Sequence, residues 1–149
     1  MSRGIFSLDF SLCLIRLQFM KNISILIRKI QSVLSDDLLH KDQKKTKKSH
    51  PYTGHCYVAS EALYHILGAK KSGLTPVCAT LFSGTSHTHW WLKDENRKTI
   101  DITAEQFTSR GINVRKKIYP YGRGTGFLTK GQSKRAQEVI RRVKKLDKS

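Results

Sequence analysis

The sequence has few acidic residues, and this shortage is its most informative bulk property. Only 11 aspartates and glutamates stand against 28 lysines and arginines, for a formal net charge of +17. Such an excess predicts attraction to polyanions: nucleic acid, an anionic surface or an acidic protein. The hydrophobic share of 38% is somewhat low, so solvated tails or linkers are expected. A chain of 149 residues fits one domain with one core.

Cysteines are also scarce. The three present, Cys13, Cys56 and Cys78, are odd in number and widely spaced, and no CxxC pair occurs. This spacing excludes a readable disulfide framework or a metal knuckle. Free thiols are typical of a reducing compartment, so we predict a cytoplasmic protein.

No long uninterrupted apolar run is present. Residues 5–20 are rich in apolar side chains, but Asp9 and Arg16 interrupt them. The stretch is too short and too charged to predict a membrane span. A signal peptide is an alternative, with a basic start at Arg3 but no clear small-residue cleavage site. A second alternative is that translation starts at Met20, which would make residues 1–19 an over-extended reading frame. We therefore divide the chain into an N-terminal extension, residues 1–20, and a single domain, residues 21–149.

Three segments have helical periodicity. Residues 21–39 form an amphipathic pattern, and residues 54–68 form the clearest one, with Cys56 in the first turn and Gly68 as a C-terminal cap. Residues 133–147 follow an N-cap serine, Ser133, and carry a narrow apolar stripe on a basic background. Between the first two, residues 40–50 contain five lysines and predict a solvated linker.

Short strands are predicted at residues 76–82, 89–93 and 98–103, the last two joined by a polar turn at 94–97. Residues 105–118 are ambiguous. The glycines of the segment GRGTGF at 122–127 predict a flexible loop. This segment lacks the GK[ST] ending of a phosphate-binding loop. The expected fold class is α+β: the 54–68 helix packed on a small antiparallel sheet, with an N-terminal and a basic C-terminal helix.

Cys56 is the first candidate for chemistry. A helix N-terminus favours a thiolate, and its free amides can hold a developing oxyanion. Gly54 would let a substrate approach the backbone there. A cysteine is otherwise often a small core residue, which is our interpretation of Cys78 and Cys13.

His89 and Asp101 supply possible partners. A hairpin centred near residue 95 places them directly opposite, with Cβ atoms about 5 Å apart. A carboxylate at that distance can fix the tautomer of an imidazole and stabilise its protonated form. The alternative is a purely structural cross-strand pair. Together the three residues fit the order nucleophile, base and orienting group.

Other candidates are less specific. His87 and His89 form HxH, which could bind a metal together with Cys56 or Asp101. Glu61 and His65 have the spacing of a surface pair on a helix. One of the adjacent tryptophans, Trp90 and Trp91, should be core, and the other could line a substrate groove.

The motifs GHCYVASEALYHILG, THWWLK, IDITAEQF and GRGTGFLT carry a resemblance. A helix-borne Cys followed by strands with His and Asp is similar to the papain-like and transglutaminase-like cysteine enzymes. More narrowly, residues 23–143 resemble a group of small phage and bacterial proteins of uncharacterised function. The resemblance implies Cys56, His89 and Asp101 as a triad, with Gln106 and Phe107 as framing residues. The glutamine that donates to the oxyanion in papain has no upstream counterpart, which leaves His55, Tyr52 or backbone amides for that role.

The sequence thus predicts a thiol-dependent hydrolase or acyltransferase acting on an amide or isopeptide bond of a protein or peptide-like substrate, without a cofactor or metal. Candidate substrate-lining residues are Gly54, His55, Trp91, Gln106 and Arg123. The alternative is a basic nucleic-acid-binding protein on a degenerate enzyme fold. Its phosphate contacts would come from the linker lysines, residues 115–117, Lys134, Arg135, Arg141, Arg142, Lys144 and Lys145.

Overall fold

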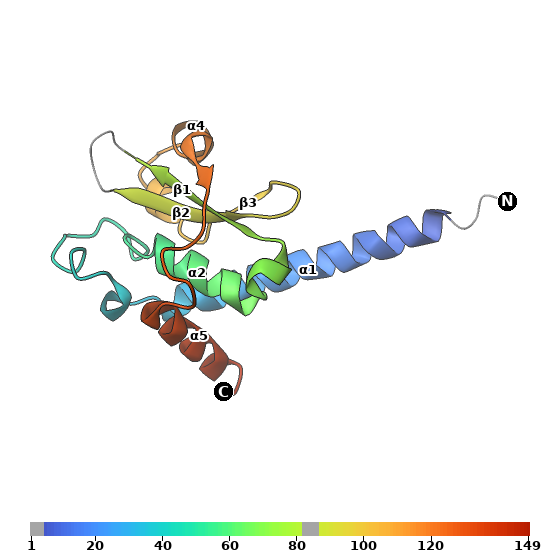
Figure 1. The fold of residues 1–149 in the computed structure, drawn as a ribbon, viewed down its shortest axis with the longest axis horizontal. Helices are drawn as coiled ribbons and strands as arrows, with labels where there is room; N and C mark the ends of the chain where they lie inside the picture. The colour runs from blue at the N-terminus through green and yellow to red at the C-terminus, as the bar shows by residue number, and fades with distance from the viewer. Residues whose placement is uncertain (1–4, 82–86) are drawn as a thin grey trace.

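The computed structural model describes residues 5–81 and 87–149 and has a mixed α+β architecture with one antiparallel sheet (Figure 1). The α-helices are α1 (Ile5–Val33), α2 (Cys56–Ile66), α3 (Glu105–Thr108), α4 (Val114–Lys117) and α5 (Lys134–Leu146). Short 3₁₀ helices are η1 (Asp36–Leu38), η2 (Ala69–Ser72) and η3 (Tyr119–Tyr121). The strands are β1 (Thr75–Thr80), β2 (Thr88–Lys93), β3 (Thr99–Ile100) and β4 (Arg123–Gly124). The predicted α+β class is confirmed.

The sheet has the strand order β3-β2-β1-β4 and is covered on both faces. Side chains alternate between faces along a strand, so neighbours on β2 enter different cores. Leu92 and its partner Ile100 join the larger core with α1, α2 and α5. Trp91 and its partner Val77 join the smaller core. Figure 1 shows α2 on one side of the sheet and α4 on the other. Coverage of both faces explains why four successive residues of β2 are buried.

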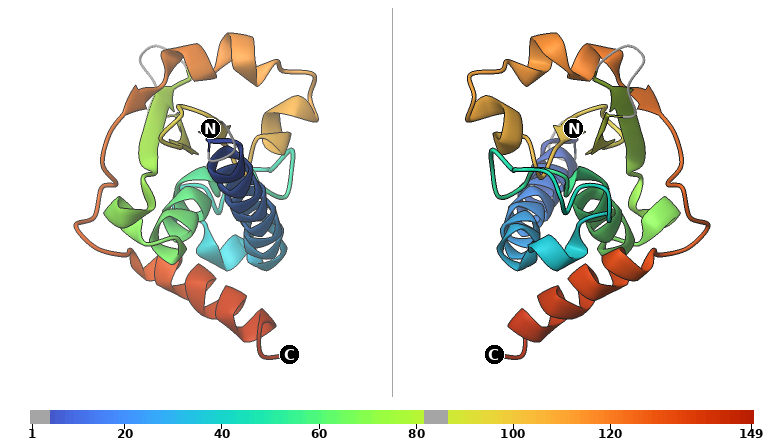
Figure 2. Two further views of the ribbon diagram at one scale, coloured as in Figure 1. Left: turned by 90° about the vertical axis from the view of Figure 1, so that its right-hand side faces the viewer. Right: turned by 90° about the vertical axis from the view of Figure 1, so that its left-hand side faces the viewer.

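The first helix runs through the predicted boundary at residue 20. Its second half is docked, with Ile23 and Ile30 in the larger core. Its first half projects away from the body, as Figures 1 and 2 show. By length and composition alone, the helical stretch Asp9–Val33 is long and apolar enough to cross a membrane. The prediction that Cys13 is a core residue is wrong, because this thiol is exposed.

The predicted 21–39 helix ends early, at Val33. Ser35 is extended, and its hydroxyl donates to the carboxylate of Asp37. Serine and aspartate offer the backbone such local alternatives to the helix. Leu38 is nevertheless buried in the core, as its place in the apolar pattern predicts.

The other two long helices match their predictions within one or two residues at each end. Gly68 follows α2 with a φ of 105°, a left-handed conformation that glycine adopts without steric cost. The Ser133 hydroxyl caps α5 by accepting a hydrogen bond from the amide of Ala136 at 3.1 Å. The buried positions of α5 are the predicted stripe of Ala136, Val139, Ile140 and Val143.

Sequence periodicity was less informative between residues 98 and 127. The strand predicted at 98–103 is only two residues long, and a turn follows it. The ambiguous residues 105–118 contain α3 and α4. Part of the loop predicted at 122–127 is β4, which pairs with β1 at the sheet edge. Phe82, the predicted end of the first strand, lies outside the described residues.

Candidate active site

Cys56 is the first residue of α2, and its side chain lies at the beginning of β2. Its Sγ is 3.8 Å from the carbonyl oxygen of Thr88, and the residue is 8% exposed. The first amides of a helix have no intrahelical acceptor. The N-cap residue, His55, makes no side-chain capping bond to them. These amides therefore remain available to an anion beside the thiol.

His89 and Asp101 form a buried ion pair. The Nε2 of His89 lies 2.7 Å from Oδ2 of Asp101, and the two side chains are 1% and 2% exposed. The predicted contact is present, but the predicted register is wrong. Leu92 pairs with Ile100, so the hairpin is centred at residue 96 rather than 95. A shift of this kind keeps both side chains on one face and makes their contact diagonal, which long side chains can span.

Aromatic rings hold the imidazole of His89 in place. Trp91 stacks on it with ring centroids 5.6 Å apart, and Phe107 meets it edge-on at 4.7 Å. Because Nε2 is committed to Asp101, the orientation leaves Nδ1 as the free nitrogen. Nδ1 is buried and has no hydrogen-bond partner among the described residues. Thr53 Oγ1, His55 Nδ1, Trp91 Nε1 and Thr103 Oγ1 are also buried without a partner among the described residues. Nδ1 of His89 differs from them because its ring is held by a buried carboxylate.

The electrostatic surroundings favour the protonated form of His89. Burial alone lowers the pKa of His89. Hydrogen bonding to Asp101, contact with Cys56 and the charges of both groups outweigh this effect and raise the pKa to about 9. The Cys56 Sγ lies against the carbonyl oxygen of Thr88, the residue directly before His89, at 3.8 Å. An imidazole that is protonated at neutral pH can serve as a proton donor.

Asp101 is held by two further hydrogen bonds that the sequence did not reveal. The Thr103 amide donates to Oδ1, and the Tyr119 hydroxyl donates to Oδ2, each at 3.1 Å. Burial and the charge of Asp101 raise the pKa of Tyr119, so its hydroxyl stays a neutral donor. Tyr119 is 18 residues from Asp101 and follows α4. No sequence pattern links a residue so placed to the triad.

Gly54 and His55 do not form a substrate surface. A Cβ at Gly54 would lie 2.8 Å from the side chain of Gln43 and 2.9 Å from that of Leu39. The space is filled by the chain itself, so the prediction of substrate approach there is wrong. The fully buried His55 places its Nε2 2.9 Å from the Ser35 carbonyl oxygen. This bond turns the side chain away from the oxyanion role considered for it.

The remaining substrate-lining candidates are also placed differently. Trp91 has no exposed surface and supports His89 from within the core. The Gln106 side chain is buried and donates to the Thr103 carbonyl, which braces the turn after Asp101. Arg123 is exposed on β4, and β1 separates β4 from β2. The structure thus gathers the three triad residues but none of these as an open lining.

Two other sequence interpretations change. The predicted pair of Glu61 and His65 is present at 4.0 Å, but Glu61 is fully buried, so it is not a surface pair. Glu61 accepts hydrogen bonds from the backbone and hydroxyl of Ser133 and from Thr129, which fixes the loop before α5. His87 is exposed, and no metal-holding group of three His, Cys, Asp or Glu side chains occurs within residues 5–81 and 87–149.

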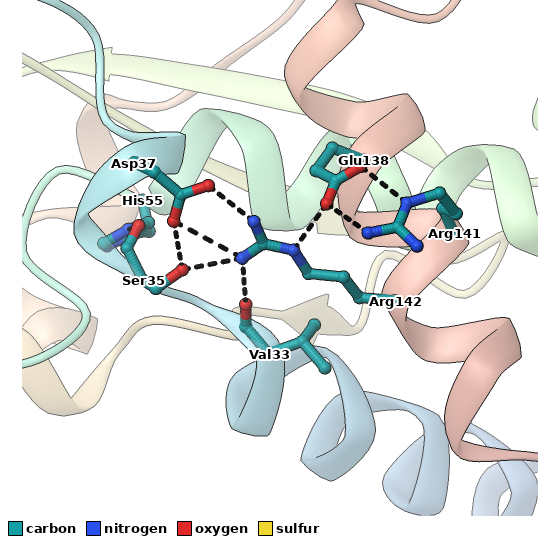
Figure 3. Close-up of polar contacts among 7 residues, drawn as sticks. All are labelled: Val33, Ser35, Asp37, His55, Glu138, Arg141 and Arg142. Atoms are coloured by element: carbon teal, nitrogen blue, oxygen red, sulfur yellow. Dashed lines mark hydrogen bonds and ion pairs between the residues drawn. The ribbon is translucent and has the colours of Figure 1, made fainter.

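Two of the predicted phosphate-binding arginines have internal roles. Figure 3 shows Arg142 donating to the Val33 carbonyl, Ser35 and Asp37, and also to Glu138. Arg135 donates to the Leu38 carbonyl. Their positive charges therefore join α5 to the end of α1. The exposed cations of this region are Lys134, Arg141, Lys144 and Lys145.

A pocket of about 530 Å³ lies on the Asp101 side of the pair. Lys98, Arg115, Tyr119 and Asp101 contribute to its lining, while Cys56 and His89 do not. This pocket therefore reaches the pair through Asp101 and does not open onto the thiol.

No family model, no curated protein and no solved structure matches the chain in comparisons with known proteins. The feature of the chain that indicates a function is therefore the geometry of Cys56, His89 and Asp101.

Proposed function

We propose that the protein is a thiol-dependent hydrolase or acyltransferase that acts on an amide or isopeptide bond. The observation that carries this proposal is the Nδ1 atom of His89. It is buried and has no hydrogen-bond partner in the described chain, and its ring is fixed by Asp101. The Cys56 Sγ lies 3.8 Å from the carbonyl oxygen of Thr88, the residue directly before His89. A nucleophile and a base oriented by a third group are the signature of covalent catalysis.

In the proposed reaction the Cys56 thiol proton resides on Nδ1 of His89, whose protonated form the surroundings favour, and the deprotonated sulfur is the nucleophile. The sulfur attacks the carbonyl carbon, and the carbonyl oxygen gains a negative charge that the α2 amides stabilise. Collapse of this intermediate breaks the C–N bond, and His89 gives its proton to the leaving amine. His89 then takes a proton from water, or from an acceptor amine, which attacks the thioester and releases Cys56.

Asp101 acts through His89 in this scheme. Its negative charge stabilises the imidazolium, and its hydrogen bond occupies Nε2 and leaves Nδ1 for proton exchange with the thiol. The arrangement of a cysteine at a helix start and a strand-borne histidine is also why we propose a papain-like or transglutaminase-like relationship. The same interpretation extends to the phage and bacterial proteins that the motifs resemble. The reducing conditions that such a thiol needs fit a cytoplasmic location.

The experiment that tests this proposal compares cysteines within one molecule. The native protein is alkylated with iodoacetamide over a pH series, and the adducts are assigned by mass spectrometry. We expect Cys56 to react well below pH ~8, where an ordinary thiol is mostly protonated. Cys13 is exposed and serves as the internal standard for a thiol without a histidine partner.

The His89→Ala variant provides the decisive control. Loss of the Cys56 reaction at low pH, with Cys13 unchanged and circular dichroism preserved, supports the catalytic pair. The catalytic pair is contradicted if Cys56 of the wild-type protein is alkylated only at the pH at which Cys13 reacts. It is also contradicted if the Cys56 alkylation rate depends on pH in the same way in both proteins.

A second candidate function is nucleic-acid binding, favoured by the exposed lysines of the linker between α1 and α2. Lys41, Lys44, Lys45 and Lys47 are all exposed, and no carboxylate pairs with them among the described residues. Binding to single- and double-stranded probes should fall steeply with salt, and replacement of these four lysines by glutamine should reduce the slope. Salt-independent binding, or none, eliminates this candidate.

A further inference from the structure

The outer half of α1, residues 9–22, is an apolar helix without a packing partner in the described structure. Phe10, Leu12 and Leu17 are 68%, 61% and 62% exposed. Burial begins only at Ile23, where the helix enters the body. Figure 1 shows this segment extending beyond every other element, and Figure 2 shows it end-on. Exposed apolar patches of this kind mark interaction sites.

Apolar side chains point to opposite sides of this segment. At 100° per residue, they leave two sectors of about 80° and 100° to polar side chains, and Lys21 falls among the apolar positions. Ser11, Gln18 and Asn22 share one of these, and Asp9 and Arg16 share the other. Gln18 also donates to Asn22 at 3.0 Å, so these polar groups partly satisfy one another. The apolar residues of the outer half are Phe10, Leu12, Cys13, Leu14, Ile15, Leu17, Phe19 and Met20.

This distribution favours lipid over a second copy of the helix. Pairing between helices requires one apolar seam at a heptad spacing. A helix with apolar side chains on opposite sides can instead bury all of them in a membrane or in a fully enclosed core. Very little of the segment is enclosed here. Its twelve residues from Asp9 to Met20 rise about 18 Å, enough to pass from the headgroups deep into the hydrocarbon.

The charges at the base of the segment complement anionic lipid headgroups. Lys21 and Arg28 are exposed where the helix meets the body. The whole protein also carries a net charge of +17. Basic residues beside an apolar helix add electrostatic attraction to its insertion into an anionic bilayer.

We propose that the outer half of α1 inserts into an anionic lipid bilayer and holds the folded body at the membrane surface. Lys21 lies at the level of the headgroups, and Arg16 extends its long side chain toward them. This membrane attachment is independent of the proposed cysteine chemistry, because none of its residues belongs to the triad.

Flotation of the full-length protein with vesicles tests the proposal. Vesicles of phosphatidylcholine and phosphatidylglycerol are mixed with the protein and centrifuged through a density gradient. We expect the protein to float with them, and a large part to remain bound at about 0.5 M NaCl, where surface charge is strongly screened. Protein that stays at the bottom of the gradient overturns the proposal.

Variants separate insertion from adsorption through the basic body. The triple variant Leu12→Gln, Leu14→Gln and Leu17→Gln should lower the lipid partition coefficient about 100-fold, because three apolar side chains no longer leave water. Ser11→Gln, on the polar sector of the same helix, should leave it unchanged. Equal binding by all three proteins overturns the proposal.

A fluorescent label reports the position of the helix directly. A polarity-sensitive dye on Cys13, in a Cys56→Ser and Cys78→Ser background, should shift to shorter wavelength when vesicles are added. Flotation without this shift indicates adsorption alone and overturns insertion. A different result would also overturn insertion. If the wild-type protein is oligomeric, the triple variant is monomeric and neither floats with vesicles, the segment binds a second copy of the chain.

Discussion

Two charged networks in this protein have opposite properties. The pair of His89 and Asp101 is buried, with side chains 1% and 2% exposed. It leaves Nδ1 without a partner. The network around Arg142 is nearer the surface, and all three guanidinium nitrogens donate hydrogen bonds (Figure 3). The His89–Asp101 pair thus has a buried nitrogen without a hydrogen bond, whereas every guanidinium nitrogen of Arg142 makes one.

The difference indicates the role of each network. A surface network that satisfies its cation fixes two elements together and has no remaining capacity for chemistry. A buried pair with a free nitrogen costs stability unless a substrate or nucleophile uses that nitrogen. The two regions also touch, because Ser35 accepts from Arg142 through its hydroxyl and faces the His55 Nε2 through its carbonyl. His55 directly precedes Cys56, so α5 indirectly supports the start of the nucleophile helix.

The largest effect should come from Asp101→Asn. Loss of the carboxylate removes the charge that stabilises the imidazolium and allows the wrong tautomer. We expect the rate of Cys56 alkylation at pH 7 to fall about 100-fold or more. Asp37→Asn, at the carboxylate that pairs with Arg142, is the matched control and should leave the rate within about twofold. Equal effects of the two variants would erase the distinction between the networks.

The next effect is a pH dependence of stability due to His89. Its folded pKa of about 9 exceeds the 6.5 of an ordinary histidine, so the folded protein holds a proton that the unfolded chain releases. The stabilisation is therefore complete below pH ~6.5 and is lost as the pH rises through ~9. Urea unfolding across this range should show a loss on the order of 3 kcal/mol in the free energy of unfolding. The loss should disappear in His89→Gln; a slope that persists there belongs to another group.

Arg142→Ala tests the other network. Removal of its hydrogen bonds to the end of α1 should lower the free energy of unfolding by roughly 1–2 kcal/mol. Arg141→Ala removes only an exposed pair with Glu138, so the expected loss is below about 0.5 kcal/mol. Chemical denaturation measures both. A larger loss for Arg141→Ala than for Arg142→Ala would contradict the assigned structural role.

The smallest effect is expected for Tyr119→Phe, which removes one hydrogen bond to Asp101 and little volume. The free energy of unfolding should fall by about 1 kcal/mol, and Cys56 alkylation should slow severalfold. The exposed neighbour Tyr121, changed to Phe, should alter neither quantity. If Tyr119→Phe also leaves the alkylation pH profile untouched, its hydroxyl supports the fold without tuning the site.

Sequence reasoning succeeded where a local pattern carries the information. The stripe of α5, the cap at Ser133 and the glycine after α2 depend on neighbours within one or two helical turns. The same holds for Cys56 at a helix start. His89 and Asp101 were paired by alternation along two adjacent strands, and a register error kept them on one face because it preserved that alternation.

The failures came from long-range packing. Periodicity could not show that Glu61 is buried under the loop before α5, or that Arg142 donates a hydrogen bond to the last residue of α1. Both depend on contacts across more than 70 residues. Gly54 looked like an opening for substrate, but residues of the linker fill the space beside it.

The sequence by itself determined the helices α2 and α5, the strands β1 and β2, and the order of Cys56, His89 and Asp101 along the chain, because hydrophobic periodicity and capping are local. Only the tertiary structure decided that Tyr119 also holds Asp101, that Trp91 and Phe107 hold the imidazole, and that the outer half of α1 has no partner within the described fold. Those features depend on which surfaces meet when the sheet is covered on both faces, and burial fixes them through packing that no single segment encodes.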